Sequence, residues 1–418
     1  MTNWSVFKFG GNSLKDIDSL KKAIELVSDF GKDPLLIVVS AMAKTTNSLE
    51  AYLEAKINGD EILAKSILDE VINFHFQLSE SMGLLDQTLK LGLEGEWNRI
   101  QGVPSDFPYD KRYDAIVSAG EIVSSMILHA AIQTKHPQSS WLDSRRVIST
   151  NNNHRRAEID LLTTEHNIQN DLKNEQGIWI TQGFIGYSME NQDYTTLGRE
   201  GSDYSAAIFA YALNAEELTI WKDVPGLMSG DPKVFENVRL LEEVPYEEAI
   251  ELAFFGASVI HPKTVQPLKS RNIILHVRSF LNNESKATKI GNFKKLKPVV
   301  PCLIKKSNQV MLSIRTKDLS FLSEGQLSEI YNIFSDIGLI VNLAQHGAAS
   351  ATFSVSNDHI ILPLVLLKLQ EYKVEIENNL VLYTVRYSDE VSRNWLYMKG
   401  KPKMEQRSLN IDRVLLSE

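Results

Sequence analysis

The densest group of chemically useful side chains lies in TTLGREGSDYSA, residues 195–206. Arg199 carries a planar guanidinium that can bind a carboxylate through two parallel hydrogen bonds. Ser202 and the amides after it lie where a helix is expected to begin, a position that favours anions. Asp203 could hold a cationic side chain in place or assist a metal-bound nucleotide. This density exceeds what a simple turn needs, so the segment predicts a site for a small anionic substrate.

A second anion-binding pattern occurs near the N-terminus, in KFGGNS, residues 8–13. Gly10 and Gly11 let the backbone approach a ligand closely and direct N–H groups toward it. Lys8 adds a mobile positive charge beside these amides. The spacing of a Walker A loop is absent. A plain strand-to-helix connection therefore remains the alternative to a polyphosphate site.

Two segments that follow apolar runs supply further polar groups. SAMAKTTN, residues 40–47, places small and hydroxyl residues at the expected end of a strand, where parallel sheets form ligand crevices. SAGE, residues 118–121, is expected to end another strand, with Glu121 at the start of a helix. That carboxylate either complements the helix dipole or binds a substrate ammonium, and both interpretations stay open.

The loop WKDVPGLMSGDPK, residues 221–233, also follows a strand and contains Pro-Gly and Asp-Pro turns. A long ordered loop at that position suits a nucleotide, and a rigid hairpin loop is the alternative. In FFGASVIHPKT, residues 254–264, a helix is expected to enter a turn stopped by proline. His261 is interpreted as a hydrogen-bonded structural residue, because the nine histidines show no metal-ligand spacing.

The elements that must position these groups are short apolar strands alternating with helices. The strands are rich in β-branched residues and apolar on both faces, which is typical of parallel sheets covered by helices. We expect an α/β three-layer sandwich with a mainly parallel central sheet, in which residues 50–110 form a helical insertion. The expected strands are residues 5–10, 34–41, 114–120, 177–184, 217–223 and 273–280.

The pattern changes after a stretch rich in lysine and proline that lacks periodicity. We therefore place a first domain at residues 1–290, a linker at 291–302 and a second domain at 303–418. The second domain shows strand and helix patterns in the order β-α-β-β-α-β, which indicates a ferredoxin-like α+β fold.

The composition argues against several classes of function. A formal net charge of -9 argues against a nucleic-acid surface, which needs a basic face. Cys302 is the single cysteine and cannot form an internal disulfide, as is typical of a reducing compartment. No run approaches the roughly 18 apolar residues that span a bilayer, and the N-terminus lacks a signal-peptide pattern. We expect a cytoplasmic protein with no membrane and no nucleic-acid partner.

These segments, in this order and spacing, resemble the aspartokinases of the amino-acid kinase family over about residues 4–290. KFGGNS is similar to the family's KFGGTS, and TTLGREGSDYSA resembles a motif specific to aspartokinases. The resemblance implies an ATP:L-aspartate 4-phosphotransferase that makes 4-phospho-L-aspartate, the first step of lysine, threonine and methionine biosynthesis. The alternatives are another amino-acid kinase, acting on glutamate, acetylglutamate, carbamate or a nucleotide, and a non-catalytic amino-acid sensor.

The resemblance also implies a role for each matching residue. Lys8 and Asp203 would be catalytic, with Lys8 stabilising charge on the transferred phosphoryl group and Asp203 organising Lys8 and the phosphates. Mg²⁺ would bridge the phosphates of ATP, held largely by the nucleotide and water, with no metal site on the protein. The aspartate-binding residues would be Thr46, Glu121, Arg199 and Ser202. The ATP-binding residues would be Lys8, Gly10, Gly11, Ser13, Lys222, Asp223, Met228, Lys233 and Ser258.

Four residues depart from the family's pattern. Asn12 replaces a threonine, and Glu200 replaces a glycine beside Arg199. Lys222 replaces a common threonine, whereas Ser258 stands where many relatives have a lysine near the nucleotide. Because one lysine is gained where another is lost, we hypothesise that Lys222 supplies the charge missing at Ser258.

Residues 303–418 resemble an ACT domain, the amino-acid-sensing module of the family. GLIVNLAQHGAASATFSVS is similar to the strand–turn–strand that carries effector contacts in relatives. One complete unit is evident, and the tail has room for a strand or two of an incomplete second unit. The resemblance leaves room for an amino-acid effector and implies a homodimer or higher homo-oligomer.

Overall fold

The computed structural model describes residues 3–172, 175–257, 259–318 and 320–417. The chain forms two compact units. The first runs from the N-terminal part to Leu227 and includes Leu240–Ile250 and Val259–Lys297. The second runs from Pro298 onward and includes Met228–Arg239 and the stretch that begins at Glu251.

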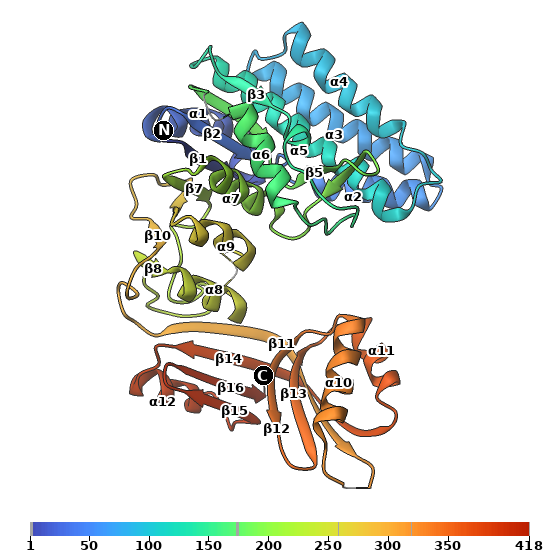
Figure 1. The fold of residues 1–418 in the computed structure, drawn as a ribbon, viewed down its shortest axis with the longest axis vertical. Coiled ribbons are helices and arrows are strands. Elements are labelled where there is room, and N and C mark those ends of the chain that lie inside the picture. The colour runs from blue at the N-terminus through green and yellow to red at the C-terminus, as the bar shows by residue number, and fades with distance from the viewer. Residues whose placement is uncertain (1–2, 173–174, 258, 319, 418) are drawn as a thin grey trace. The chain divides into compact units, whose positions relative to one another are not determined.

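The first unit is built on an eight-stranded sheet in the order β3-β4-β2-β1-β7-β9-β10-β8 (Figure 1). Every neighbouring pair is parallel except β10 with β9. The central strands β1 and β2 are buried throughout, because SVFKF and LLIVV are covered on both faces. The strands are β1 Ser5–Phe9, β2 Leu35–Val39, β3 Ser140–Leu142, β4 Ile178–Gln182, β7 Glu217–Lys222, β8 Glu243–Pro245, β9 Ile274–Ser279 and β10 Thr288–Gly291.

Helices and one hairpin complete this unit. The region from residue 50 to 110 folds as helices, and α5 continues well beyond it. The helices are α1 Ile17–Phe30, α2 Thr45–Ile57, α3 Glu61–Ser81, α4 Gln87–Gln101, α5 Tyr109–Gln133, α6 Leu161–Leu172, α7 Gly201–Leu213, α8 Tyr246–Phe255 and α9 Pro262–Ser270. Short 3-10 turns cover Gly11–Leu14 and Ser144–Arg146, and the hairpin pairs β5 Ile185–Ser188 with β6 Asp193–Thr196.

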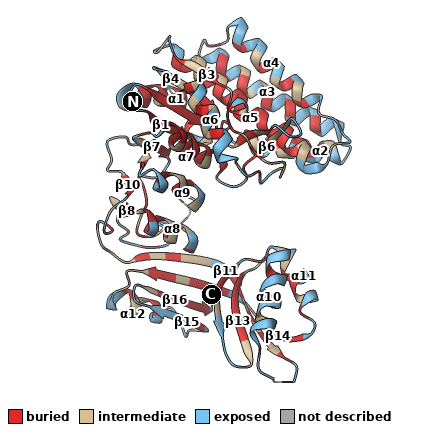
Figure 2. Cartoon of the chain, in the orientation of Figure 1, coloured by how far each residue is buried: buried red, intermediate tan, exposed pale blue. Residues whose placement is uncertain are grey.

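The strand predicted at residues 114–120 is wrong, because this segment lies inside α5. A short apolar run occurs both in buried strands and in helices that are buried on most sides, so the run alone does not tell the two apart. Figure 2 shows α5 largely in the buried class. By length and composition α5 could cross a membrane, but 83% of its most apolar window is buried inside the protein, as in a core helix. Glu121 therefore lies in mid-helix, which removes the helix-dipole interpretation of its carboxylate.

The segment around His261 also differs from expectation. Pro262 does not stop a helix but begins α9, because proline is well suited to the first helical position. The ring of His261 caps this helix by accepting a hydrogen bond from the backbone N–H of Lys263 at 3.2 Å. The interpretation of His261 as a hydrogen-bonded structural residue agrees with this contact.

The second unit contains a six-stranded antiparallel sheet in the order β12-β13-β11-β14-β16-β15. Its first six elements follow the predicted order β-α-β-β-α-β. The last of these is a single continuous strand, Tyr372–Arg386, which pairs with β11 through a bulge at Gln309. The elements are β11 Cys302–Thr316, α10 Glu324–Ile337, β12 Val341–His346, β13 Ser350–Ser356, α11 Ile361–Lys368, β14 Tyr372–Arg386, α12 Glu390–Met398, β15 Met404–Ser408 and β16 Ile411–Ser417.

The C-terminal tail extends this same sheet. β16 pairs with the second half of β14, and β15 pairs with β16. The 15-residue strands β11 and β14 are long enough to serve both halves of the sheet. The predicted fold class, an α/β sandwich followed by an α+β domain, is confirmed.

Candidate active site

The parallel sheet brings the predicted segments to one edge. Lys8 lies near the end of β1, and the turn at Gly10 and Gly11 follows this strand. Residues 40–46 follow β2, which pairs with β1, and Asp223 follows β7 on the other side of β1. Crevices at the carboxyl ends of parallel strands are the usual ligand sites of such sheets.

Asp203 lies between two lysines from neighbouring strands. Lys8 Nζ lies 2.7 Å from one carboxylate oxygen, and Lys222 Nζ lies 3.0 Å from the other. Burial alone would raise the pKa of Asp203, but the positive charges of Lys8 and Lys222 lower it overall. The carboxylate is therefore ionised at neutral pH and fixes both amines in place.

The first turn of α7 presents Asp203 and Ser202 to this edge. Gly183, just after β4, approaches so closely that an added Cβ would lie 2.7 Å from the Cα of Ser202. Glu200 precedes the helix in the left-handed conformation, with φ 57°, where glycine is favoured. Its carboxylate lies 3.8 Å from Lys222. The glycine expected at position 200 thus matches the backbone, and glutamate there adds strain and a negative charge.

The glycine turn after β1 borders a cavity of about 320 Å³. A Cβ on Gly11 would lie 2.5 Å from the backbone oxygen of Ala41, so this position tolerates no side chain. A Cβ on Gly10 would meet only the Lys8 amine, at 3.7 Å, so Gly10 leaves the space beside that amine open. The cavity is lined by Lys8, Gly10, Gly11, Asn12, Ser13, Ala43, Trp221, Lys222 and Asp223.

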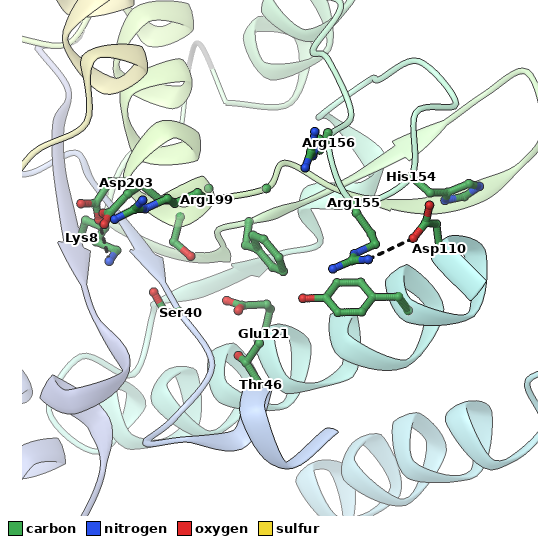
Figure 3. A pocket seen from close by; sticks show the side chains of 16 residues that line it. Lys8, Ser40, Thr46, Asp110, Glu121, His154, Arg155, Arg156, Arg199 and Asp203 are labelled. Atoms are coloured by element: carbon green, nitrogen blue, oxygen red, sulfur yellow. Dashed lines mark hydrogen bonds and ion pairs between the residues drawn. The ribbon is translucent and has the colours of Figure 1, made fainter. Parts of the chain in front are cut away.

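A second cavity, of about 830 Å³, also begins at Lys8. In Figure 3, Lys8, Asp203 and Arg199 lie on one side, Arg155 and Asp110 on the other, and Glu121 and Thr46 between them. All four predicted substrate-binding residues line it. The lining residues are Lys8, Ser40, Thr46, Asp110, Tyr113, Glu121, His154, Arg155, Arg156, Phe184, Gly198, Arg199, Glu200, Gly201, Ser202 and Asp203.

Glu121 is the buried acid of this cavity. It is 3% exposed, and its Oε2 has no hydrogen-bond partner among the described residues. Burial raises its pKa to about 8, although a backbone hydrogen bond from Ala41 and the charge of Lys8 act in the opposite direction. An incoming ammonium group would supply the missing partner and favour the ionised carboxylate.

Sequence reasoning missed the wall of the cavity formed by Asp110, Tyr113 and the loop His154–Arg156. The basic run His-Arg-Arg was the available signal, but nothing local connects it to the site. The connection is Asp114 on α5, a fully buried carboxylate. It accepts hydrogen bonds from the Thr196 hydroxyl at 2.6 Å, the His154 ring at 2.9 Å and the Arg155 backbone N–H at 3.0 Å.

Two of the predicted ATP-binding residues are not among those that line these cavities. Met228 and Lys233 line neither cavity and belong to Met228–Arg239, which packs with the second unit. Ser258 lies outside the described residues. Within the described ranges, no group of three or more His, Cys, Asp or Glu side chains could hold a metal ion.

The sequence model of the amino acid kinase family matches residues 3–279. The chain belongs to the amino acid kinase family. Within this family it is 30% identical over 408 residues to the lysine-sensitive aspartokinase 3 of Escherichia coli, covering 93% of this chain and 88% of that protein. The predicted resemblance to aspartokinases is confirmed.

Solved structures of this amino acid kinase family agree with the same assignment. Escherichia coli aspartokinase III in complex with aspartate and ADP superposes with a TM-score of 0.83 at 28% identity. The same enzyme in complex with lysine and aspartate gives a TM-score of 0.80. Both comparisons cover 99% of this chain and 96% of the other.

Proposed function

We propose that this protein transfers the γ-phosphoryl group of ATP to the side-chain carboxylate of L-aspartate and so makes 4-phospho-L-aspartate. The observation that carries the proposal is the position of Lys8. Its amine borders both the cavity at Gly10 and Gly11 and the cavity that contains Glu121 and Arg199. A nucleotide in the first and an amino acid in the second would meet at this amine. The aspartokinase relatives support the same reaction.

The reaction needs alignment and charge neutralisation more than proton transfer. The aspartate carboxylate is ionised at neutral pH and is already a nucleophile. One of its oxygens forms a bond to the γ-phosphorus, while the bond from that phosphorus to the bridging oxygen breaks and its electron pair leaves with ADP. We propose that Lys8 and Lys222, which Asp203 holds in place, neutralise charge on the transferred group.

We assign the substrate's functional groups as follows. Glu121 binds the ammonium, because the Oε2 atom of its buried carboxylate lacks a hydrogen-bond partner among the described residues. Arg199 binds a carboxylate, because its guanidinium forms no ion pair with any residue that the structure describes and lines the cavity beside Lys8. Thr46 and Ser202 supply hydroxyl groups to the same substrate.

On the nucleotide side, we propose that Gly10, Gly11, Ser13 and Asp223 border the phosphates, with Asn12 holding Asp223 through a hydrogen bond of 3.0 Å. Lys222 would supply the charge that many relatives carry at position 258. Met228 and Lys233 would lie on the adenosine side. Mg²⁺ would arrive as the magnesium complex of ATP, because the described side chains offer no cage of acidic or histidine ligands.

The test is ATP turnover with aspartate, glutamate and acetylglutamate supplied in parallel. Turnover with aspartate alone supports the proposal, turnover with another acceptor favours another amino-acid kinase, and no ATP consumption favours the sensor. Thermal-shift titrations with lysine and threonine would test an amino-acid effector of the second unit, since a ligand of the native state raises stability. Sedimentation would test the proposed homodimer, and fractionation the cytoplasmic location.

A further inference from the structure

Glu200 has a backbone conformation that a glutamate adopts only at a cost. Its φ of 57° and ψ of 24° lie in the left-handed region, where glycine is favoured. Glu200 comes directly before the first turn of α7, but its side chain does not cap this helix. A cap hydrogen bond therefore does not compensate for the strain. Because backbone strain of this kind is concentrated at functional sites, it indicates a function for the side chain.

The carboxylate of Glu200 contacts an amine on the proposed nucleotide side. Its Oε2 lies 3.8 Å from Lys222 Nζ, and Lys222 is its one ion-pair partner among the residues that the structure describes. The same amine lies 3.0 Å from Asp203. The side chain of Asp203 is 2% exposed, whereas that of Glu200 is 30% exposed. Asp203 is thus the fixed partner of Lys222, and Glu200 is the partner that a ligand can replace.

This ion pair lies where the two cavities meet. Lys222 lines the cavity at the glycine turn, Glu200 lines the larger cavity, and Lys8 borders both. Under the proposed function, the γ-phosphoryl group is the part of ATP that reaches this boundary, since it is the group that moves to the acceptor. Its negative charge would compete with the carboxylate of Glu200 for the amine of Lys222.

We infer that Glu200 is a specificity residue that holds the Lys222 amine in place of the γ-phosphoryl group and releases it when ATP binds. This inference rests on the proposed function. ADP has no γ-phosphoryl group, so Glu200 keeps its contact with Lys222 when ADP is bound. Glu200 therefore weakens the binding of ATP and leaves that of ADP unchanged. The inference also accounts together for two departures from the family's pattern, because the glutamate at 200 and the lysine at 222 contact each other.

The test measures nucleotide binding directly, by calorimetry with Mg²⁺ at low ionic strength, where exposed ion pairs are least screened. The probes are ADP and the ATP analogue that carries an imido group between its β- and γ-phosphorus atoms. Glu200→Gln keeps the size of the side chain and removes its charge. It should lower the dissociation constant of the analogue by about twofold to fivefold, the effect of losing a competing ion pair of this exposure. The dissociation constant of ADP should stay within about 1.5-fold of wild type on the same reasoning.

A second measurement uses Lys222→Ala as the background. Once the amine is gone, Glu200 has nothing for which to compete, so adding Glu200→Gln should leave the dissociation constant of the analogue unchanged. Glu247→Gln is the matched control, since Glu247 pairs with Lys269 at 2.6 Å and lines neither cavity. This control variant should bind both nucleotides as wild type does.

Three results would overturn the inference. The first is an unchanged affinity of Glu200→Gln for the analogue. The second is an equal gain for ADP and the analogue, and the third is the same gain in the Lys222→Ala background. Either of the last two indicates general repulsion between Glu200 and phosphates and not competition for one amine. Because binding is measured without turnover, wild type that binds the analogue but does not phosphorylate aspartate would contradict the proposed function alone. Wild type that binds neither nucleotide would contradict both.

Discussion

Lys222 and Lys8 contact opposite oxygens of the Asp203 carboxylate, at 3.0 and 2.7 Å. With Glu200 3.8 Å from Lys222, the cluster contains two positive and two negative charges before any nucleotide binds. An arrangement of this kind holds both amines in place. It also means that each member affects the positions of the others, which makes the cluster open to mutational tests.

Asp203→Asn removes the charge that holds the two lysines together. We expect kcat to fall by about a hundredfold or more, as for loss of a preorganised electrostatic group. The free energy of unfolding should fall by about 3 kcal/mol, because two poorly solvated amines lose their counterion. Steady-state kinetics and urea denaturation measure the two effects. Asp412→Asn is the matched control, since Asp412 is also buried and contacts two cations, Arg393 at 2.8 Å and Arg407 at 3.0 Å, in the second unit. Equal activity losses in both variants would contradict a special role for Asp203.

Lys222→Ala should raise KM for ATP severalfold and leave KM for aspartate nearly unchanged, because Lys222 lines only the cavity at the glycine turn. Lys222→Arg should restore part of the loss, since it keeps the charge. Lys32→Ala serves as the control, because Lys32 pairs with Glu217 at the opposite end of the same strand. An unchanged KM for ATP in Lys222→Ala would exclude the compensation for position 258.

The two glycines after β1 should respond differently to alanine. Gly11→Ala places a methyl group against the backbone oxygen of Ala41 and should destabilise the fold by about 1–3 kcal/mol. Gly10→Ala meets only the Lys8 amine, so the protein should fold normally but bind ATP several times more weakly. Thermal unfolding and KM for ATP separate the two effects. Normal ATP binding by a well-folded Gly10→Ala variant would argue against phosphates beside Gly10.

Glu121 predicts a pH dependence of stability. Burial raises its pKa from 4.5 to about 8, so the unfolded chain loses the proton at lower pH than the folded protein. The stabilisation is fully present below pH 4.5 and is lost as the pH rises toward 8. Glu121→Gln should abolish this loss, and the free energies of unfolding of variant and wild type should diverge by a few kcal/mol between about pH 5 and pH 8. Parallel pH profiles would show that Glu121 is not the responsible group. Aspartate binding to wild type should release a proton near pH 7, which calorimetry in two buffers detects.

Local sequence patterns predicted candidate residues that lie together at one strand end or one helix start. The candidates Lys8, Gly10, Gly11, Ser202 and Asp203 line the two cavities, and they could be chosen because strand ends and helix starts can be recognised from spacing. Their roles stay predictions. The apolar run at 114–120 was wrongly predicted to be a strand, since a helix that is buried on most sides has the same apolar sequence pattern as a buried strand. The role of Asp114 could not be predicted, because it contacts the backbone of a residue 41 positions away.

The pairing of Lys222 with Asp203 was also beyond local patterns. It depends on the parallel register that sets β7 beside β1 and on the rotation of α7. No spacing in the sequence contains that information. The placement of Met228 and Lys233 relative to ATP stays a prediction.

The central claim concerns which bond is made, and the most direct measurement is to trap the product. An acyl phosphate reacts with hydroxylamine to give a hydroxamate, whereas a phosphate ester or free phosphate does not. Wild type incubated with ATP, Mg²⁺, aspartate and hydroxylamine should yield the 4-hydroxamate of aspartate in equal amount to the ADP formed, and Lys8→Ala should yield almost none. ADP formation without the aspartyl hydroxamate would contradict the claim that this protein phosphorylates the side chain of aspartate. Hydroxamate formation from glutamate in preference to aspartate would contradict it equally.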